Sequence, residues 1–154
     1  MRDHLLSVRL LSWLLPALFV LGSGFSQARA ADMKLEVQLL WGTNDKQSPD
    51  PKHRPVDDDV HKKLKELPLK WSNYFLVNNK QFDVSANGTA KVPLSEKCSI
   101  EVKNLGHSTV EVSLFGKGEK VVGRTQALPK GEILVLGGNA PNATAWLVIL
   151  KRLE

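Results

Sequence analysis

The chain has 154 residues, a net charge of +5 and a single cysteine, Cys98. This length suits one domain with one hydrophobic core, and a lone cysteine excludes an internal disulfide. The 21 basic and 16 acidic residues are interspersed without a basic stripe, which argues against nucleic acid as a partner.

Residues 1–30 have the pattern of a secretory signal peptide. Arg2 and Arg9 precede the apolar run 10–21, and Ala28-Arg29-Ala30 fits a cleavage site. The run has about a dozen residues, whereas a spanning helix needs ~20. Cleavage would remove three basic residues and one acidic residue, so the charge of +5 would become +3. We therefore expect an exported protein, periplasmic, cell-surface or secreted, with no transmembrane span after signal cleavage.

Residues 31–154 are expected to form a single β-rich domain. Apolar side chains alternate over 34–41, which predicts a half-buried strand. A polar loop with three prolines follows from residue 42. Val60, Leu64 and Leu67 then form a narrow apolar stripe that predicts a short helix ending before Pro68. The loop and the helix together occupy about residues 42–67.

The middle of the chain predicts a series of short strands. Residues 69–78 form an aromatic strand, a turn is expected at 78–80, and a new strand begins near residue 82. Asn87-Gly88 is typical of a type I′ hairpin turn leading into 89–94. Strands with regular turns between them are then expected over 99–105, 109–115 and 120–128.

The last two strands are predicted over 133–136 and 146–150. Both are continuously apolar, and turn-forming residues join them. Continuous apolar character is typical of strands covered on both faces, which places this pair in the middle of the fold. Eight or nine strands in all indicate an all-β protein with one short helix, either an antiparallel β-sandwich or a barrel.

A metal site is conceivable in the predicted loop and helix. Asp57 and His61 lie four residues apart and would share a helix face, and His53 and Asp50 precede them. We prefer the simpler interpretation, a capping aspartate and an exposed histidine, because no paired-histidine motif supports the site. No cofactor is expected. Cys98 is expected to be a half-buried small apolar residue.

The aromatic residues are the better indication of binding. Trp41 and Trp146 lie on strands whose patterns predict core positions. Tyr74 is expected to be the most exposed aromatic side chain of the domain. Tyr74 and Trp71 are therefore the candidate binding residues.

Several segments together resemble an uncharacterised family of small exported bacterial β-domains with a Sec-type leader and no assigned activity. The matching pieces are the leader, the strand LEVQLLWGT at 35–43, the segment LKELPLKWSNYF at 64–75 and the glycine-rich turn before Trp146. The resemblance implies export and a compact β fold. It implies no catalytic residues.

Two functions follow as expectations. The first is a non-enzymatic cell-envelope module that binds a protein or a polysaccharide through a sheet face or its loops. The second is a small exported hydrolase or metal-binding enzyme with a site in the 45–61 loop and helix. We prefer the first, because the sequence contains no recognisable catalytic motif.

Overall fold

A computed structural model describes residues 31–140 and 144–154 of the chain. The predicted signal peptide, residues 1–30, lies outside the described residues, and so do residues 141–143 of the predicted final turn. Within the described residues, no helix is long and apolar enough to cross a membrane.

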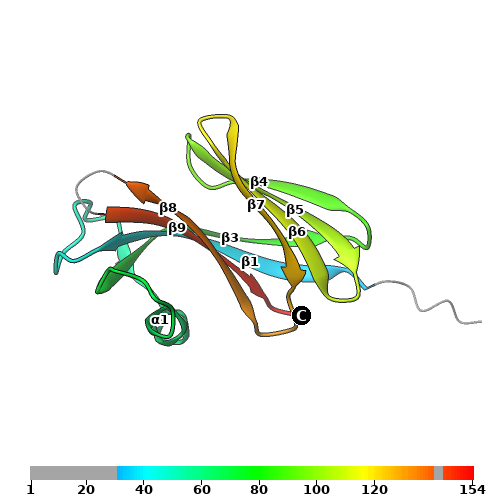
Figure 1. The fold of residues 1–154 in the computed structure, drawn as a ribbon, viewed down its shortest axis with the longest axis horizontal. Helices are drawn as coiled ribbons and strands as arrows, with labels where there is room; N and C mark the ends of the chain where they lie inside the picture. The colour runs from blue at the N-terminus through cyan, green and yellow to red at the C-terminus, as the bar shows by residue number, and fades with distance from the viewer. Residues whose placement is uncertain (1–30, 141–143) are drawn as a thin grey trace, which may run out of the picture.

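Strands dominate the described part of the chain, which forms two antiparallel sheets packed face to face (Figure 1). The predicted β-sandwich is therefore confirmed, and the barrel alternative is wrong because each sheet keeps two edges of its own. In chain order, the elements are β1 (Met33–Thr43), β2 (Arg54–Pro55), α1 (Asp58–Lys65), β3 (Asn73–Val84), β4 (Thr89–Pro93), β5 (Cys98–Gly106), β6 (Thr109–Gly116), β7 (Glu119–Ala127), β8 (Ile133–Ala140) and β9 (Thr144–Arg152).

The two sheets differ in size. The long sheet has the order β2-β3-β1-β9-β8, and the short sheet has the order β4-β5-β6-β7. The short sheet covers one face of the long sheet, here called the inner face, and α1 lies against the opposite, outer face (Figure 1). The long sheet is thus the middle of three layers.

Strand β1 lies in the centre of the long sheet, and its alternating sequence explains that position. Leu35, Val37 and Leu39 point to the inner face and are almost fully buried there. The pairing of β1 with β3 shifts between Leu39 and Leu40, where β3 contains the extra residue Val77. Such a bulge bends the strand and increases its twist.

Strand β3 is one continuous element, whereas the sequence predicts two strands separated by a turn at 78–80. That prediction is wrong, because Asn78, Asn79 and Lys80 pair with successive residues of β1. The gain from pairing with a central strand outweighs the local preference of asparagine for turns. The first predicted strand also begins too early, since residues 69–72 precede β3.

A turn lies near the predicted Asn87-Gly88 position, but its central residues are Ala86 and Asn87, and it does not close a hairpin. Asn87 has a φ of 57°, and Gly88 N–H donates to Ser85 O at 2.8 Å. A type I′ turn needs positive φ at both central residues, and Ala86 is not among the residues with positive φ. The turn instead carries the chain from β3 in the long sheet to β4 in the short sheet, so the predicted hairpin is wrong.

The main core lies between the two sheets. Its long-sheet half comes from β1, β8 and β9, and its short-sheet half comes mostly from β5 and β6. Full burial of one such aliphatic side chain contributes roughly 1.5–3 kcal/mol relative to an exposed position. The most deeply buried members include Leu35, Val37, Ile100, Val102, Val110, Val112, Leu128 and Leu150.

A second cluster fills the space between α1 and the outer face of the long sheet. Val60 and Leu64 of α1 pack there with Leu40, Leu147 and Ile149. Strand β9 is therefore covered on both faces and lies between two strands, as its continuous apolar sequence predicts. Its partner β8 lies at the edge of the long sheet. The predicted cover on both faces is nevertheless correct for β8 as well, because Leu134 and Leu136 belong to the main core while Ile133 and Val135 pack against the second cluster.

Candidate ligand groove at the open end of the sandwich

The two ends of the long sheet are not covered alike. The main core reaches Leu39 on β1 and Val148 on β9 and goes no further along either strand in that direction. The next inner-face residues, Trp41 and Trp146, are paired across the two strands beyond the core. We call this the open end of the sandwich, and the end that carries Leu150 the closed end.

The tryptophan pair departs from the prediction that both rings belong to the core. Trp146 is 41% exposed, and Trp41 is half-buried. Their ring centroids are 4.5 Å apart with planes inclined by 65°, an edge-to-face arrangement. The prediction fails because the core between the sheets ends before these residues, so their inner side lacks the packing that the same face has at the closed end.

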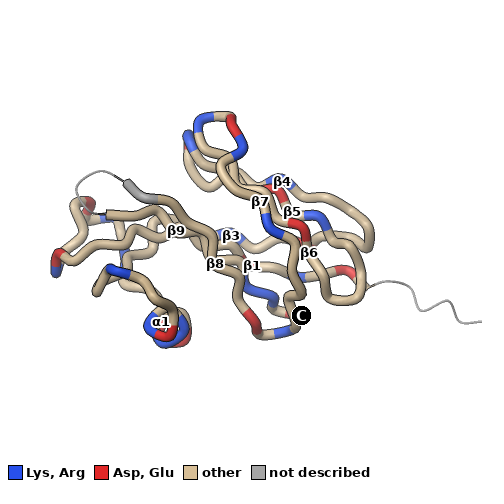
Figure 2. The backbone as a smooth tube through the Cα atoms, viewed as in Figure 1, with Lys and Arg blue, Asp and Glu red and all other residues tan. Residues whose placement is uncertain are grey.

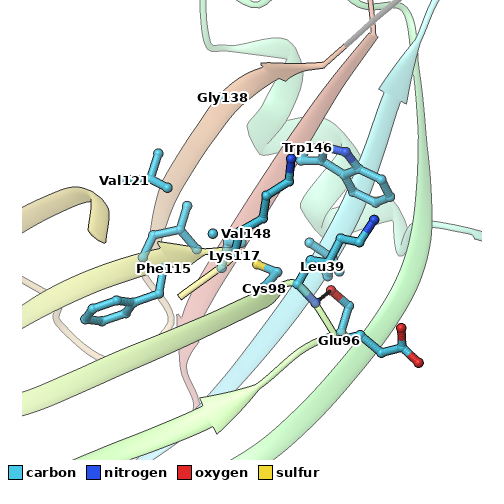
Figure 3. Close-up of a pocket in the computed structure, with 13 residues that line it drawn as sticks. Leu39, Glu96, Cys98, Phe115, Lys117, Val121, Gly138, Trp146 and Val148 are labelled. Atoms are coloured by element: carbon cyan, nitrogen blue, oxygen red, sulfur yellow. Dashed lines mark hydrogen bonds between the residues drawn. The ribbon is translucent and has the colours of Figure 1, made fainter. Parts of the chain in front are cut away.

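A groove of about 850 Å³ lies between the sheets at this end. Figure 3 shows Phe115 and Val121 on one side, Trp146 and Leu39 on the other, and Cys98 between them. The long sheet contributes Leu39, Gly138, Trp146 and Val148. The short sheet and its turns contribute Ser95, Glu96, Lys97, Cys98, Leu114, Phe115, Gly116, Lys117 and Val121.

Two turns of the short sheet form the polar side of the groove. The β6–β7 turn has two central residues, Lys117 and Gly118, with φ values of 52° and 84°. Positive φ at both positions defines a type I′ turn, and glycine at the second position relieves the strain there. Lys117 N–H donates to Lys97 O of the β4–β5 turn at 2.8 Å, so a hydrogen bond holds the two turns together.

A bulge in β7 exposes an apolar side chain beside the groove. Val121 has no partner on β6, because Leu114 pairs with Val122 and Phe115 pairs with Lys120. Val121 is consequently 60% exposed and lines the groove. The two consecutive valines that interrupt the alternation of β7 are the only sequence signal of this position, and the sequence analysis missed it.

The ionisable lining of the groove comprises Glu96, Lys97, Cys98 and Lys117. Cys98 is half-buried, as expected, and burial raises the pKa of its thiol. Among the described residues that line the groove there is no histidine that could act as a base beside this thiol. The groove is a mostly apolar cavity with a few polar side chains, an arrangement that can bind a molecule.

The predicted binding residues Tyr74 and Trp71 lie elsewhere. Tyr74 is only 6% exposed, and its hydroxyl donates to Trp71 O at 3.0 Å. A Cβ placed on Gly42 would lie 3.4 Å from either ring, so both rings pack on the outer face of β1. The prediction of an exposed Tyr74 is wrong because α1 covers this face. Burial raises the pKa of the Tyr74 hydroxyl.

The conceivable metal ligands His53, Asp57 and His61 are not brought together. Within residues 31–140 and 144–154, no three histidine, cysteine or acidic side chains are grouped so that they could hold a metal ion. Asp57 is the N-cap residue of α1 and makes no side-chain capping bond. The His61 ring lies edge-to-face against Tyr74, with centroids 6.5 Å apart.

The 45–61 loop contains a serine, a histidine and an aspartate in contact. Ser48 Oγ lies 2.6 Å from His53 Nδ1, and Asp50 Oδ2 lies 3.9 Å from His53 Nε2. The same residues also fold the loop locally, because Asp50 Oδ1 accepts from Lys52 N–H and Asp50 O accepts from His53 N–H. These short-range contacts are those of a turn motif, and none of the three residues lines the groove.

No known protein family, curated protein or solved structure matches the chain. The resemblance to small exported bacterial β-domains therefore stays a prediction.

Proposed function

We propose that the chain is a non-enzymatic binding module of the cell envelope that acts after export, and that its groove holds the apolar part of a ligand. The observation that supports this is the pair of exposed apolar side chains at the open end, Trp146 and Val121, beside a floor of aliphatic residues. Concave apolar sites with few polar groups are the usual form of ligand sites, and grouped exposed apolar residues mark interaction surfaces.

The lining of the groove suits an apolar part of a protein better than a polysaccharide, the other expected kind of partner. A polysaccharide needs hydrogen-bonding side chains beside a stacking ring, whereas Leu39, Leu114 and Val148 offer none. The polar lining is confined to Cys98 and the two turns. An apolar ligand, or an apolar part of a protein, suits these walls better than a sugar chain does.

A neutral fluorescent dye tests the proposal. N-phenyl-1-naphthylamine should become brighter on binding to the module. Gly138→Phe should abolish this signal, because a Cβ on Gly138 has no heavy atom within 4 Å and a ring there extends into the groove. The thermal unfolding curve should show that the variant remains folded.

A matched pair of variants serves as the control. Val121→Asp should weaken dye binding, whereas Leu105→Asp should not, because Leu105 is also an exposed apolar residue of the short sheet but does not line the groove. Equal dye binding by the wild type and by Gly138→Phe would contradict the proposal.

A protein partner has a second candidate surface, the free edge of β8. The other three edges carry features that discourage strand pairing: β2 has two residues, β4 contains Pro93, and β7 has a bulge and three charged residues. The eight residues of β8 include no proline and no charged residue, and their pairing with β9 is uninterrupted. An extended segment of a partner could therefore add a strand there.

Hydrogen exchange tests whether that edge is available. Every second amide of β8 should exchange quickly, while the amides that face β9 should be protected. Uniform protection along β8 in the isolated module would show that the edge is already covered, and it would remove this second candidate.

A further inference from the structure

We propose that the groove binds a single-chain anionic amphiphile, that is, a molecule with one apolar chain and a carboxylate or similar anion at its end. This inference rests on the groove being the binding site proposed above. It adds the chemical class of the ligand, which we infer from the charges of the two turns.

The floor of the groove requires an apolar ligand body. Leu39, Leu114 and Val148 belong to the main core and are at most 7% exposed, yet they also line the groove. Nothing in this floor can replace the hydrogen bonds that a polar ligand group would lose on leaving water. A volume of about 850 Å³ is within the range of ordinary ligand pockets, so an acyl chain has room in it.

The two turns supply positive charge beside this floor. Lys97 and Lys117 both line the groove, and the hydrogen bond between their backbones keeps the turns adjacent. Figure 2 shows basic positions on both turns above the long sheet. Neither ammonium group takes part in an ion pair or a side-chain hydrogen bond with the described part of the chain.

The balance of charge favours an anion over a cation or a neutral head group. Of the described residues that line the groove, Glu96 is the only acidic one; it offsets one of the two lysines, so these residues retain one net positive charge. An anion near Lys97 and Lys117 would gain two favourable charge interactions and would reduce their mutual repulsion. A cationic head group would add to that repulsion.

Three ligands with the same chain and different head groups test this class. Decanoate, decanol and decylammonium are titrated below their aggregation concentrations, with dye displacement or tryptophan fluorescence as the readout. Decanoate should bind most tightly and decylammonium least. Raising the salt concentration should weaken decanoate binding and leave decanol binding unchanged, because salt screens exposed charges.

A pair of charge-matched double variants identifies the head-group site. Lys97→Gln with Lys117→Gln should weaken decanoate binding by roughly three- to tenfold and leave decanol binding unchanged. Lysine and glutamine both carry an unbranched Cβ, so Lys117→Gln adds no backbone strain at the positive φ of position 117. The control is Lys103→Gln with Lys130→Gln, which removes the same charge away from the groove and should change neither affinity.

The possible outcomes separate this inference from the proposed function. Equal binding of the three compounds would overturn the anionic class and leave the apolar groove as a binding site. Failure of all three compounds and of the neutral dye would overturn both. A concentration-dependent dimer, seen by sedimentation and abolished by Gly138→Phe, would identify a second copy of the chain as the occupant and would overturn the amphiphile.

Discussion

Strand β9 presents the same face to two different environments. Leu150 and Trp146 lie on the inner face four residues apart, but Leu150 is 1% exposed and Trp146 is 41% exposed. The short sheet covers the closed end of this face, and the core ends before the open end (Figure 1). Leu150 and Trp146 share the strand, the face and an apolar side chain. Their different exposure therefore depends on how far the short sheet extends over the long sheet.

The outer face of the same strand shows that the open end is not simply loose. Leu147 and Ile149 are at most 3% exposed, because α1 and the surrounding residues pack over them. The long sheet at the open end is thus held by its backbone pairing and by packing on one face. A groove on the other face can admit a ligand while the sheet stays ordered.

The largest expected effect is at the closed end. Leu150→Ala should lower the free energy of unfolding by about 2–5 kcal/mol, because it leaves a cavity between two packed sheets. Denaturant unfolding measures this value. A loss below about 1 kcal/mol would show that the closed end repacks easily, and the contrast between the two ends would then fail.

A polar residue at the closed end should have the next largest effect. Asn104 is fully buried, its Nδ2 group donates to Ala31 O and Val84 O, and its Oδ1 accepts from Gly106 N–H. Asn104→Ala leaves these groups without partners and should cost about 1–3 kcal/mol. Asn79→Ala, at an exposed position of β3, is the control and should change stability little. Equal losses would contradict a specific role for Asn104.

The open end should be less sensitive to truncation. Trp146→Ala removes a partly exposed ring and its contact with Trp41, so it should cost roughly 0.5–1.5 kcal/mol. The same variant should weaken binding of the neutral dye, since Trp146 lines the groove. A loss of stability as large as that of Leu150→Ala would show that the two ends are packed alike.

The sequence predicts where the strands lie in the chain better than it predicts which strands lie beside one another. Alternation identifies the inner face of β1, and the apolar run of β9 indicates cover on both faces. The pattern cannot show that Asn78–Lys80 would pair with β1, or that the Asn87 turn would lead from one sheet to the other. Both depend on which strand lies alongside, and that is decided by contacts distant in the sequence.

The groove was not predictable for a related reason. It combines residues of β1 and β9 with two turns of the short sheet, and no local pattern records where one sheet ends above another. The prediction selected Tyr74 as the exposed aromatic side chain, whereas Tyr74 is buried under α1 and Trp146 is exposed. A helix with two buried residues, Val60 and Leu64, was enough to reverse the exposure expected for Tyr74.

The smallest expected effect is a change of thiol reactivity within the groove. Because burial raises the pKa of Cys98, less of its thiol is ionised at pH 8 than in the unfolded chain, and the thiolate is the reactive form. Alkylation by iodoacetamide should therefore be slower in the folded protein, and its rate should continue to rise above the pH at which the reaction of the unfolded chain levels off. Decanoate should protect Cys98 in the wild type and not in Gly138→Phe. Equal rates for the folded and unfolded chains at pH 8 would show that the thiol is open to solvent, and that the groove is less enclosed around Cys98 than the structure indicates.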